Sequence, residues 1–216
     1  LPWREIERYS ASGLGGITVP REFGGADVSH VTLADVFRII SAADPSLGQI
    51  PQNHFGFLNL LRLTGTPAQQ RHYYEGVLAG GRLGHAGPER HTRHTRDIEA
   101  RLVPDGDGYR VSGRKFYSTG ALFAHWIPTK VLDTEGRLVT VVLERGVPGV
   151  SVVDDWSSFG QRTTASGTVL LDNVRVEAGS ILPAWLAQQA PVLLGPFAQL
   201  MQAAIDAGIA EGALQY

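Results

Sequence analysis

The spacing of hydrophobic residues changes twice along this chain, and these changes constrain its fold most. Up to about residue 81, apolar side chains recur at the period of a helix, as at Leu33 and Phe37. They then alternate with polar ones in short runs, which is typical of strands in an antiparallel sandwich or barrel. Helical spacing returns after Pro183. We therefore expect an α+β fold with an N-terminal helical domain (1–81), a central antiparallel β-barrel or sandwich (82–182) and the start of a C-terminal helical bundle (183–216).

The composition excludes several classes of protein. The chain has 216 residues, 43% of them hydrophobic, which is enough to bury a substantial core. Its formal net charge is −2, so nothing favours nucleic acid or a membrane surface as a partner. No apolar run reaches the roughly 18 residues of a membrane span, and the absence of cysteine excludes disulfides and thiolate chemistry. We expect a cytoplasmic protein.

Both ends of the sequence lie inside helical patterns. The chain begins at Leu1 without an initiator methionine, and it stops at Tyr216 within an apolar helical repeat that neither glycine nor proline ends. We therefore expect a fragment of a longer polypeptide.

Helix-capping residues predict where the N-terminal helices begin. Ser29 or Thr32 is expected to cap the first long helix after the N-terminal loop. Ser46 resembles the start of a capping box, with a helix starting near Ile50, and Thr66 starts a later helix. The helix near Ile50 is expected to bury a stripe made of Ile50, His54, Phe57, Leu58 and Leu61.

The stretch from Trp156 to Val176 places aromatic rings beside small hydroxyls. Trp156 and Phe159 precede Thr163, Thr164 and Ser166. Rings beside neutral hydrogen-bond donors suit a planar heterocycle that is stacked and bonded along its edge. The alternative is a Ser/Thr-rich turn before a strand. Phe116 and Ser118 repeat the pairing, and alternation along a strand would place both on one face of the sheet.

His54 has two interpretations. A lone histidine on an apolar helix face is usually a core residue with satisfied hydrogen bonds. Beside a reactive cofactor, it would instead shuttle protons or donate a hydrogen bond.

The loop from Gly84 to Asp97 is rich in histidine and arginine. His85, His91 and His94 lack the fixed spacing and firm third ligand of a metal site, so no metal is expected. The loop is either a solvated basic segment or a site where arginines attract an anionic ligand tail. These arginines are Arg90, Arg93 and Arg96. Dinucleotide and P-loop fingerprints are absent, so a nicotinamide cofactor would bind a different protein.

Four motifs together resemble the acyl-CoA dehydrogenase superfamily over essentially the whole chain. They are GLGGITVPREFGGADVS, ADPSLG, GYRVSGRKFYSTGALFAHW and FGQRTTASGTVLLDNVRV. Within the superfamily, FYSTGALF and FGQRTTASGTV are most similar to the flavin-dependent monooxygenase branch, which includes dibenzothiophene monooxygenase and sulfur-acquisition oxidoreductases. The resemblance also implies a fragment that lacks most of the C-terminal helical domain.

This resemblance implies a two-component monooxygenase in sulfur metabolism. Such an enzyme uses reduced FMN and oxygen on a small organosulfur compound, and a separate NAD(P)H-dependent flavin reductase supplies the reduced flavin. FAD is the alternative cofactor, and the full-length protein is expected to be a homotetramer.

The resemblance also assigns roles to individual residues. His54 and Ser118 would be catalytic, and His54, Leu58 and Trp156 would line the substrate pocket. The flavin would be bound by His85, Glu89, Arg90, Phe116, Tyr117, Ser118, Thr119 and Ser166. This chain departs from the branch at two positions, because His85 replaces an asparagine and Pro88 replaces a hydroxyl residue.

Two other functions remain open. An FAD-dependent acyl-CoA dehydrogenase needs a carboxylate base for the α-proton of its substrate. In some relatives this base lies on the first long C-terminal helix, but no acid occurs between Glu177 and Asp206. The third possibility is a truncated, non-catalytic remnant.

Overall fold

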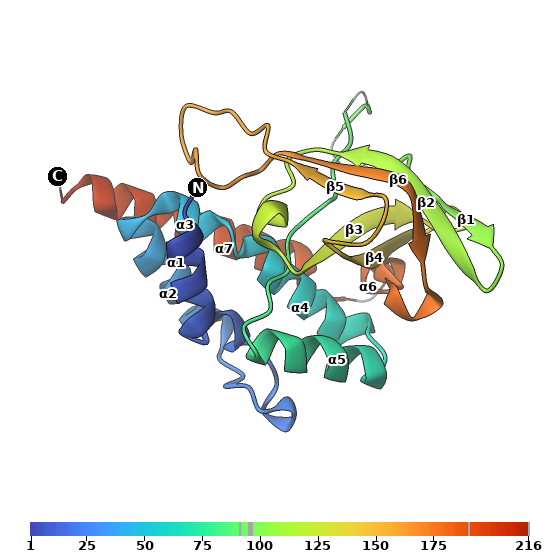
Figure 1. Cartoon of the computed structure of the whole chain (residues 1–216). Coiled ribbons are helices and arrows are strands. Elements are labelled where there is room, and N and C mark those ends of the chain that lie inside the picture. The colour runs from blue at the N-terminus through green and yellow to red at the C-terminus, as the bar shows by residue number, and fades with distance from the viewer. Residues whose placement is uncertain (91, 95–96, 190, 216) are drawn as a thin grey trace.

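Helices from both ends of the chain form one layer, and the strands between them form the other (Figure 1). The computed structural model describes residues 1–90, 92–94, 97–189 and 191–215. None of the helices among these residues is long and apolar enough to cross a membrane. The helical layer contains α1 (Trp3–Ala11), α2 (His30–Ala43), α3 (Pro45–Gln49), α4 (Gln52–Thr64), α5 (Pro67–Leu78), α6 (Ala184–Gln189) and α7 (Leu194–Ala213).

Side-chain caps fix the start of several helices. Ser29 caps α2, as predicted, because its hydroxyl accepts from the Thr32 amide. Thr66 forms the predicted capping box with Gln69 at the start of α5. The capping box predicted at Ser46 is wrong. Asp44 caps α3 instead, because its carboxylate directly precedes Pro45 and accepts from two free amides of the first turn.

The strands form two antiparallel sheets, which confirms the predicted α+β class. One sheet has the order β1-β2-β6-β5 and the other has the order β3-β4-β7. Their buried faces share one apolar cluster, which includes Val111, Ile127, Val141 and Val169. The strands are β1 (Leu102–Asp105), β2 (Gly108–Lys115), β3 (Trp126–Leu132), β4 (Leu138–Glu144), β5 (Val150–Val153), β6 (Thr168–Val176) and β7 (Ile181–Leu182).

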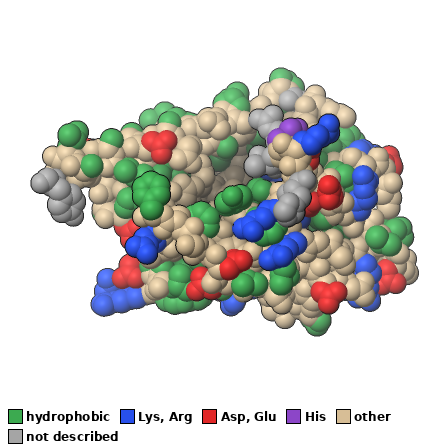
Figure 2. Space-filling model, turned by 90° about the horizontal axis from the view of Figure 1, so that it is seen from above, with side chains coloured by type: hydrophobic (Ala, Val, Ile, Leu, Met, Phe, Trp, Pro, Cys, Tyr) green, Lys and Arg blue, Asp and Glu red, His purple; other side chains and the backbone are tan. Residues whose placement is uncertain are grey.

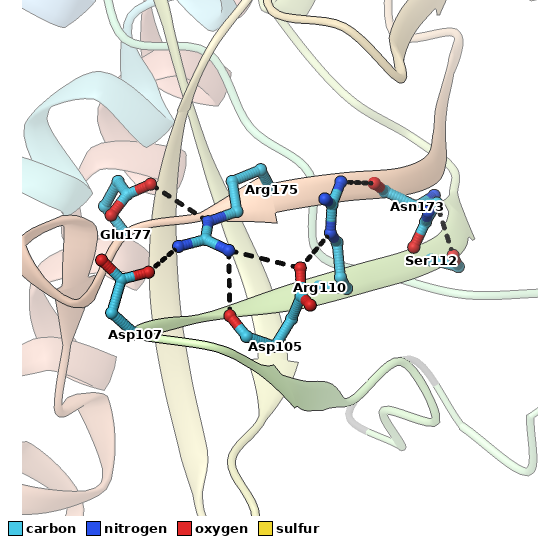
Figure 3. Close-up of polar contacts among 7 residues, drawn as sticks. All are labelled: Asp105, Asp107, Arg110, Ser112, Asn173, Arg175 and Glu177. Carbon is cyan, nitrogen blue, oxygen red and sulfur yellow. Dashed lines mark hydrogen bonds and ion pairs between the residues drawn. The ribbon is translucent and has the colours of Figure 1, made fainter.

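Charged side chains tie the β1–β2 hairpin to β6 (Figure 3). Arg175 donates to the Asp105 backbone and side chain and pairs with Asp107 and Glu177. Arg110 donates to Asp105 at 2.6 Å and to the Asn173 carbonyl at 3.0 Å. The donors and acceptors of these side chains thus pair with one another. We conclude that the cluster holds the hairpin in place.

Helix α7 packs closely along α2. At Gly208 an added Cβ would lie 2.2 Å from the Arg38 carbonyl, so glycine is what permits the approach. Phe197, Met201 and Ile205 are buried in the core that α2 and α4 share with α7. Leu200, on the same helix, is 41% exposed.

A small apolar cluster joins the helices to the β module. It consists of Ile6 from α1, Ile50 after α3, Phe123 and Ala165. The last two residues belong to the loops that follow β2 and β5. This junction places those loops against α1 and α3.

Candidate functional site

The backbone turns sharply where β2 ends at Lys115. Tyr117 has φ 51°, a left-handed conformation that side chains other than glycine rarely adopt. The Phe116 amide donates to the Pro88 carbonyl, and the Ser118 amide donates to the Gly167 carbonyl. Alternation along a strand therefore cannot place Phe116 and Ser118 on one face, although both are buried.

Three hydroxyls form a hydrogen-bonded group next to this turn, those of Thr119, Thr164 and Ser166. We call these three residues, together with the neighbouring Ser118, the hydroxyl cluster. The Ser166 hydroxyl lies 2.8 Å from those of Thr119 and Thr164. The Ser118 hydroxyl is fully buried and has no partner among the residues that the structure describes. An unsatisfied buried hydroxyl usually marks a missing water or ligand.

Two rings stand beside the hydroxyl cluster. Tyr117 is 55% exposed, and its ring meets that of Trp156 edge to face with centroids 6.1 Å apart. The indole N–H of Trp156 donates to the Gln161 carbonyl. The face that carries the β5–β6 loop is hollowed in its middle, with basic side chains beside the hollow (Figure 2). Tyr117 and Trp156 thus offer flat surfaces next to neutral donors.

Phe116 has a different environment from these two rings. It is buried, with the guanidinium of Arg90 4.0 Å and that of Arg114 5.1 Å from its ring centroid. Such stacking holds both guanidiniums in place. The Phe116 ring is thus covered by arginine, and Arg90 lies next to the segment that carries Ser118.

The carboxylate of Glu89 is directed into the protein. It pairs with Lys115, which is fully buried, and accepts from the amides of Glu99 and Ala100. Burial lowers the pKa of Lys115, and the Glu89 carboxylate opposes that shift. Glu89 therefore fixes the position of the loop before Arg90.

His54 is held by backbone groups on both ring nitrogens. Its Nε2 lies 2.8 Å from the Gly15 carbonyl, and its Nδ1 accepts from the Leu83 amide at 3.2 Å. This pairing requires the neutral tautomer with the proton on Nε2. Burial lowers the pKa of His54 to about 4, so the ring is neutral at pH 7. It faces a small cavity of about 30 Å³, which it shares with Tyr9, Arg82 and Phe123.

His85 lies in a larger cavity between the two layers, which we call the interlayer cavity. Its volume is about 260 Å³, and Phe57 and Leu60 of α4 line it together with Leu194 and Ala198 of α7. Burial and the nearby Lys130 lower the pKa of His85 to about 3, so it too is neutral. The cavity walls are mainly apolar, and the neutral imidazole of His85 lies among a few other polar side chains, namely Asn53, Lys130, Thr140 and Gln188.

The structure brings together only part of the predicted site. Tyr117, Trp156 and the hydroxyl cluster are neighbours. His54 and Leu58 lie on the other side of α4 from the interlayer cavity, and Leu58 belongs to the helical core. Phe116 lines a separate pocket with Glu89 and Arg90, whereas His54 lines the small cavity described above.

Sequence reasoning missed Lys115 and Gln161, which hold the two sides of the site. Lys115 lies in a strand of alternating character, where a lysine normally faces water. Gln161 lies within the motif FGQRTTASGTV, which does not distinguish it from its neighbours. Its left-handed backbone, φ 41°, has no sequence signal because glutamine rarely adopts it.

The histidine-rich loop shows no metal site in its described part. His94 lies 3.2 Å from Asp97, and Arg93 is exposed and also pairs with Asp97. No group of three or more potential ligands occurs among the described residues. His91 and Arg96 lie outside them.

The fold and a family match define the class of this protein. Residues 1–81 match the model of the acyl-CoA dehydrogenase N-terminal domain. FMN-bound TdsC from Paenibacillus sp. A11-2 superposes with a TM-score of 0.92 at 29% identity, over 99% of this chain and 57% of that one. The chain belongs to the acyl-CoA dehydrogenase superfamily.

Within this superfamily, the chain is similar to monooxygenases. It is 33% identical to dibenzothiophene monooxygenase of Rhodococcus erythropolis, over 97% of this chain and 54% of the relative. It is 30% identical to the probable FMNH2-dependent monooxygenase SfnC of Pseudomonas putida, over 99% of this chain and 54% of the relative. The chain thus spans about half the length of these curated relatives.

Proposed function

We propose that this protein is a two-component monooxygenase that uses reduced FMN and oxygen on a small organosulfur compound. The observation that carries the proposal is the buried hydroxyl of Ser118, which has no partner among the described residues. In sequence, Ser118 lies between Tyr117, whose ring meets that of Trp156, and Thr119, whose hydroxyl bonds to that of Ser166. The similarity to dibenzothiophene monooxygenases and to FMN-bound TdsC supports it.

The residues present fit FMN. An isoalloxazine needs a flat contact and neutral edge donors, which Tyr117 and the hydroxyl cluster offer. Its phosphate needs cations, and the exposed Arg90 lies beside the same segment. We therefore propose that Tyr117, Ser118, Thr119 and Ser166 contact the flavin, with Arg90 near the phosphate. Phe116 and Glu89 would act indirectly, by supporting Arg90 and its loop.

Bound reduced FMN would supply two electrons, so that one atom of O2 reaches sulfur and the other leaves as water. The protein's part is to donate hydrogen bonds and exclude water. We propose that Ser118 is the catalytic donor. His54 is a second candidate, which would have to exchange its bond to Gly15 for one to the reactants.

We propose the interlayer cavity as part of the substrate site. Its walls suit an apolar sulfide, and His85 stands there as a neutral hydrogen-bonding group where the branch has asparagine. Trp156 would close the site from the loop side. Leu58 would help to hold α4 in place, because its side chain packs in the apolar core that α2 and α4 share with α7.

A separate NAD(P)H-dependent flavin reductase would deliver the reduced FMN, in keeping with the missing nicotinamide fingerprint. We further propose a cytoplasmic homotetramer. Size-exclusion chromatography with light scattering measures the oligomeric state.

The deciding experiment supplies the purified protein with a flavin reductase, NADH, FMN, 18O2 and dibenzothiophene. We expect a sulfoxide that carries one 18O atom. The FAD-dependent acyl-CoA dehydrogenase predicts instead that acyl-CoA alone bleaches the bound flavin without oxygen. A non-catalytic remnant predicts neither result and no FMN binding, so either outcome would overturn the proposal.

A further inference from the structure

Four glutamines and one aspartate connect the loop that carries Trp156 to helix α7. Gln161 donates to Gln49, Gln49 to Gln52, Gln52 to Gln202, and Gln202 to Asp206. The donor–acceptor distances along this series are 3.4, 2.6, 3.2 and 3.0 Å. We call these five side chains the amide relay. It runs from the β5–β6 loop through α3 and α4 to α7.

The chemistry of Asp206 gives the relay a direction. An ionised carboxylate only accepts, so Gln202 must present its NH2 group to Asp206 and its carbonyl to Gln52. Because the Gln202 carbonyl then accepts, Gln52 must direct its NH2 group to Gln202 and its carbonyl to Gln49. Gln49 in turn directs its NH2 group to Gln52 and its carbonyl to Gln161. Gln161 therefore finds an acceptor at Gln49 and adds a second bond to the Pro45 carbonyl at 3.2 Å. One terminal charge thus orients every amide up to the loop.

Gln161 is also the local centre of the loop. Its carbonyl accepts from the indole N–H of Trp156 at 3.2 Å and from the Thr164 hydroxyl at 3.1 Å. The left-handed backbone of Gln161 and Ala165, with φ 41° and 47°, is unfavourable and persists only where surrounding contacts hold it. The side-chain bonds of Gln161 to α3 are such contacts.

The middle member of the relay, Gln52, reaches the wall of the interlayer cavity. Gln52 donates to the carbonyl of Ala198 at 3.4 Å, and Ala198 lines that cavity. The relay thus links Trp156 to the α7 turn that faces His85. These are the walls on which the proposed substrate site depends.

We infer that Gln161 is a positioning residue, which through the amide relay holds Trp156 at a fixed distance from the cavity wall of α7. The inference rests on the proposed function for its catalytic consequence, though not for its geometry. Without the relay, the loop relaxes, Trp156 moves, and the substrate is held less closely while reduced flavin still binds.

The test compares Gln161→Met with Gln70→Met in the complete protein. Methionine matches the length of glutamine but cannot donate, and Gln70 likewise donates to two carbonyls, those of Leu61 and Arg62, away from the loop. We expect Gln161→Met to raise the KM for dibenzothiophene about tenfold and to divert reduced FMN to hydrogen peroxide. FMN affinity should change less than twofold, and Gln70→Met should change none of these values.

Two further measurements distinguish the positioning of Trp156 from a general destabilisation of the protein. In a Trp156→Ala background, Gln161→Met should leave KM unchanged, because the positioned ring is gone; a further tenfold rise would overturn the inference. Gln49→Met should reproduce Gln161→Met, and the double variant should be no worse than either single one. Additive effects would show that the residues act separately and would refute the relay.

Hydrogen exchange provides a readout that does not depend on activity. Amides of residues 157–167 should exchange at least tenfold faster in Gln161→Met than in the parent protein or in Gln70→Met. Unchanged exchange would overturn the inference even if the protein is an active monooxygenase. Faster exchange without any oxygenated product in the parent protein would retain the inference and reject the proposed function.

Discussion

Lys115 donates to the carboxylate of Glu89 inside the protein, where the lysine side chain is 0% exposed and the glutamate side chain 8% exposed. Lys115 also donates to the Lys130 carbonyl at 2.6 Å. Glu89 in turn accepts from the amides of Glu99 and Ala100. The pair therefore joins the loop before Arg90 to β2 and β3, and it supports one side of the proposed flavin site.

Removing one partner of this pair should destabilise the protein strongly. Lys115→Met leaves the Glu89 carboxylate buried without its cation, which typically costs about 3–5 kcal/mol. Urea denaturation followed by circular dichroism measures the loss. Arg93→Gln is the control, because the exposed pair of Arg93 with Asp97 contributes at most about 1 kcal/mol. Equal losses in the two variants would argue against a special role for the buried pair.

The fold was more predictable than the site because periodicity and capping are local signals. Ser29 and Thr66 act within one turn of their own helices, so the sequence alone indicated both. The Ser46 capping box failed because Asp44 competes for the same amides with a full charge. Lys115 faces inward only because Glu89, distant in sequence, meets it across the β module.

His54 should make the stability of the protein depend on pH. Its pKa is lowered to about 4 in the folded protein, against 6.5 for an ordinary histidine. As pH falls below 6.5, the unfolded chain takes up a proton that the folded protein cannot accept, so stability is lost down to about pH 4. The loss amounts to about 3 kcal/mol, since each pKa unit corresponds to about 1.4 kcal/mol.

The variant His54→Gln retains one donor and one acceptor but does not titrate. We expect a shallower fall of the unfolding free energy between pH 6.5 and 4, measured by urea titration at each pH. His85 adds to the same fall, so part of it should remain. Asn59→Gln, a non-titrating change on the same helix, should keep the parent slope. A His54→Gln slope identical to that of the parent would mean that the imidazole is accessible to protons.

Close packing of α7 on α2 predicts opposite effects for two glycine substitutions in one helix. Gly208→Ala would place a Cβ 2.2 Å from the Arg38 carbonyl, and such overpacking costs about 1–3 kcal/mol. At Gly195 nothing lies within 4 Å, so Gly195→Ala should stabilise the helix by about 0.5–1 kcal/mol. Thermal unfolding of both variants tests this difference in sign. Stabilisation by Gly208→Ala would show that the helices can separate at little cost.

The site was harder to predict because its geometry depends on unusual backbone angles and distant partners. The motif that contains Tyr117 and Ser118 indicated their importance, but not that Tyr117 leaves the strand in a left-handed conformation. Nor could it show that the two backbone partners of His54 come from the Gly15 loop and from Leu83. Such contacts arise only when the two layers pack together.

The left-handed backbone at Tyr117 predicts that stability and function change in opposite directions. A non-glycine residue at φ 51° costs about 1–2 kcal/mol, whereas glycine adopts this angle freely. Because Tyr117 is 55% exposed and its removal costs little packing, Tyr117→Gly should raise the unfolding free energy by up to about 1 kcal/mol. The same change removes a flat surface beside Ser118, so FMN should bind about tenfold more weakly. Thermal unfolding and fluorescence titration with FMN measure the two effects.

Asn173→Gly, at the same φ of 51° on β6, is the control and should leave FMN affinity unchanged. Unchanged FMN affinity in Tyr117→Gly would remove the tyrosine from the proposed flavin site, because relief of backbone strain alone does not affect ligand contacts.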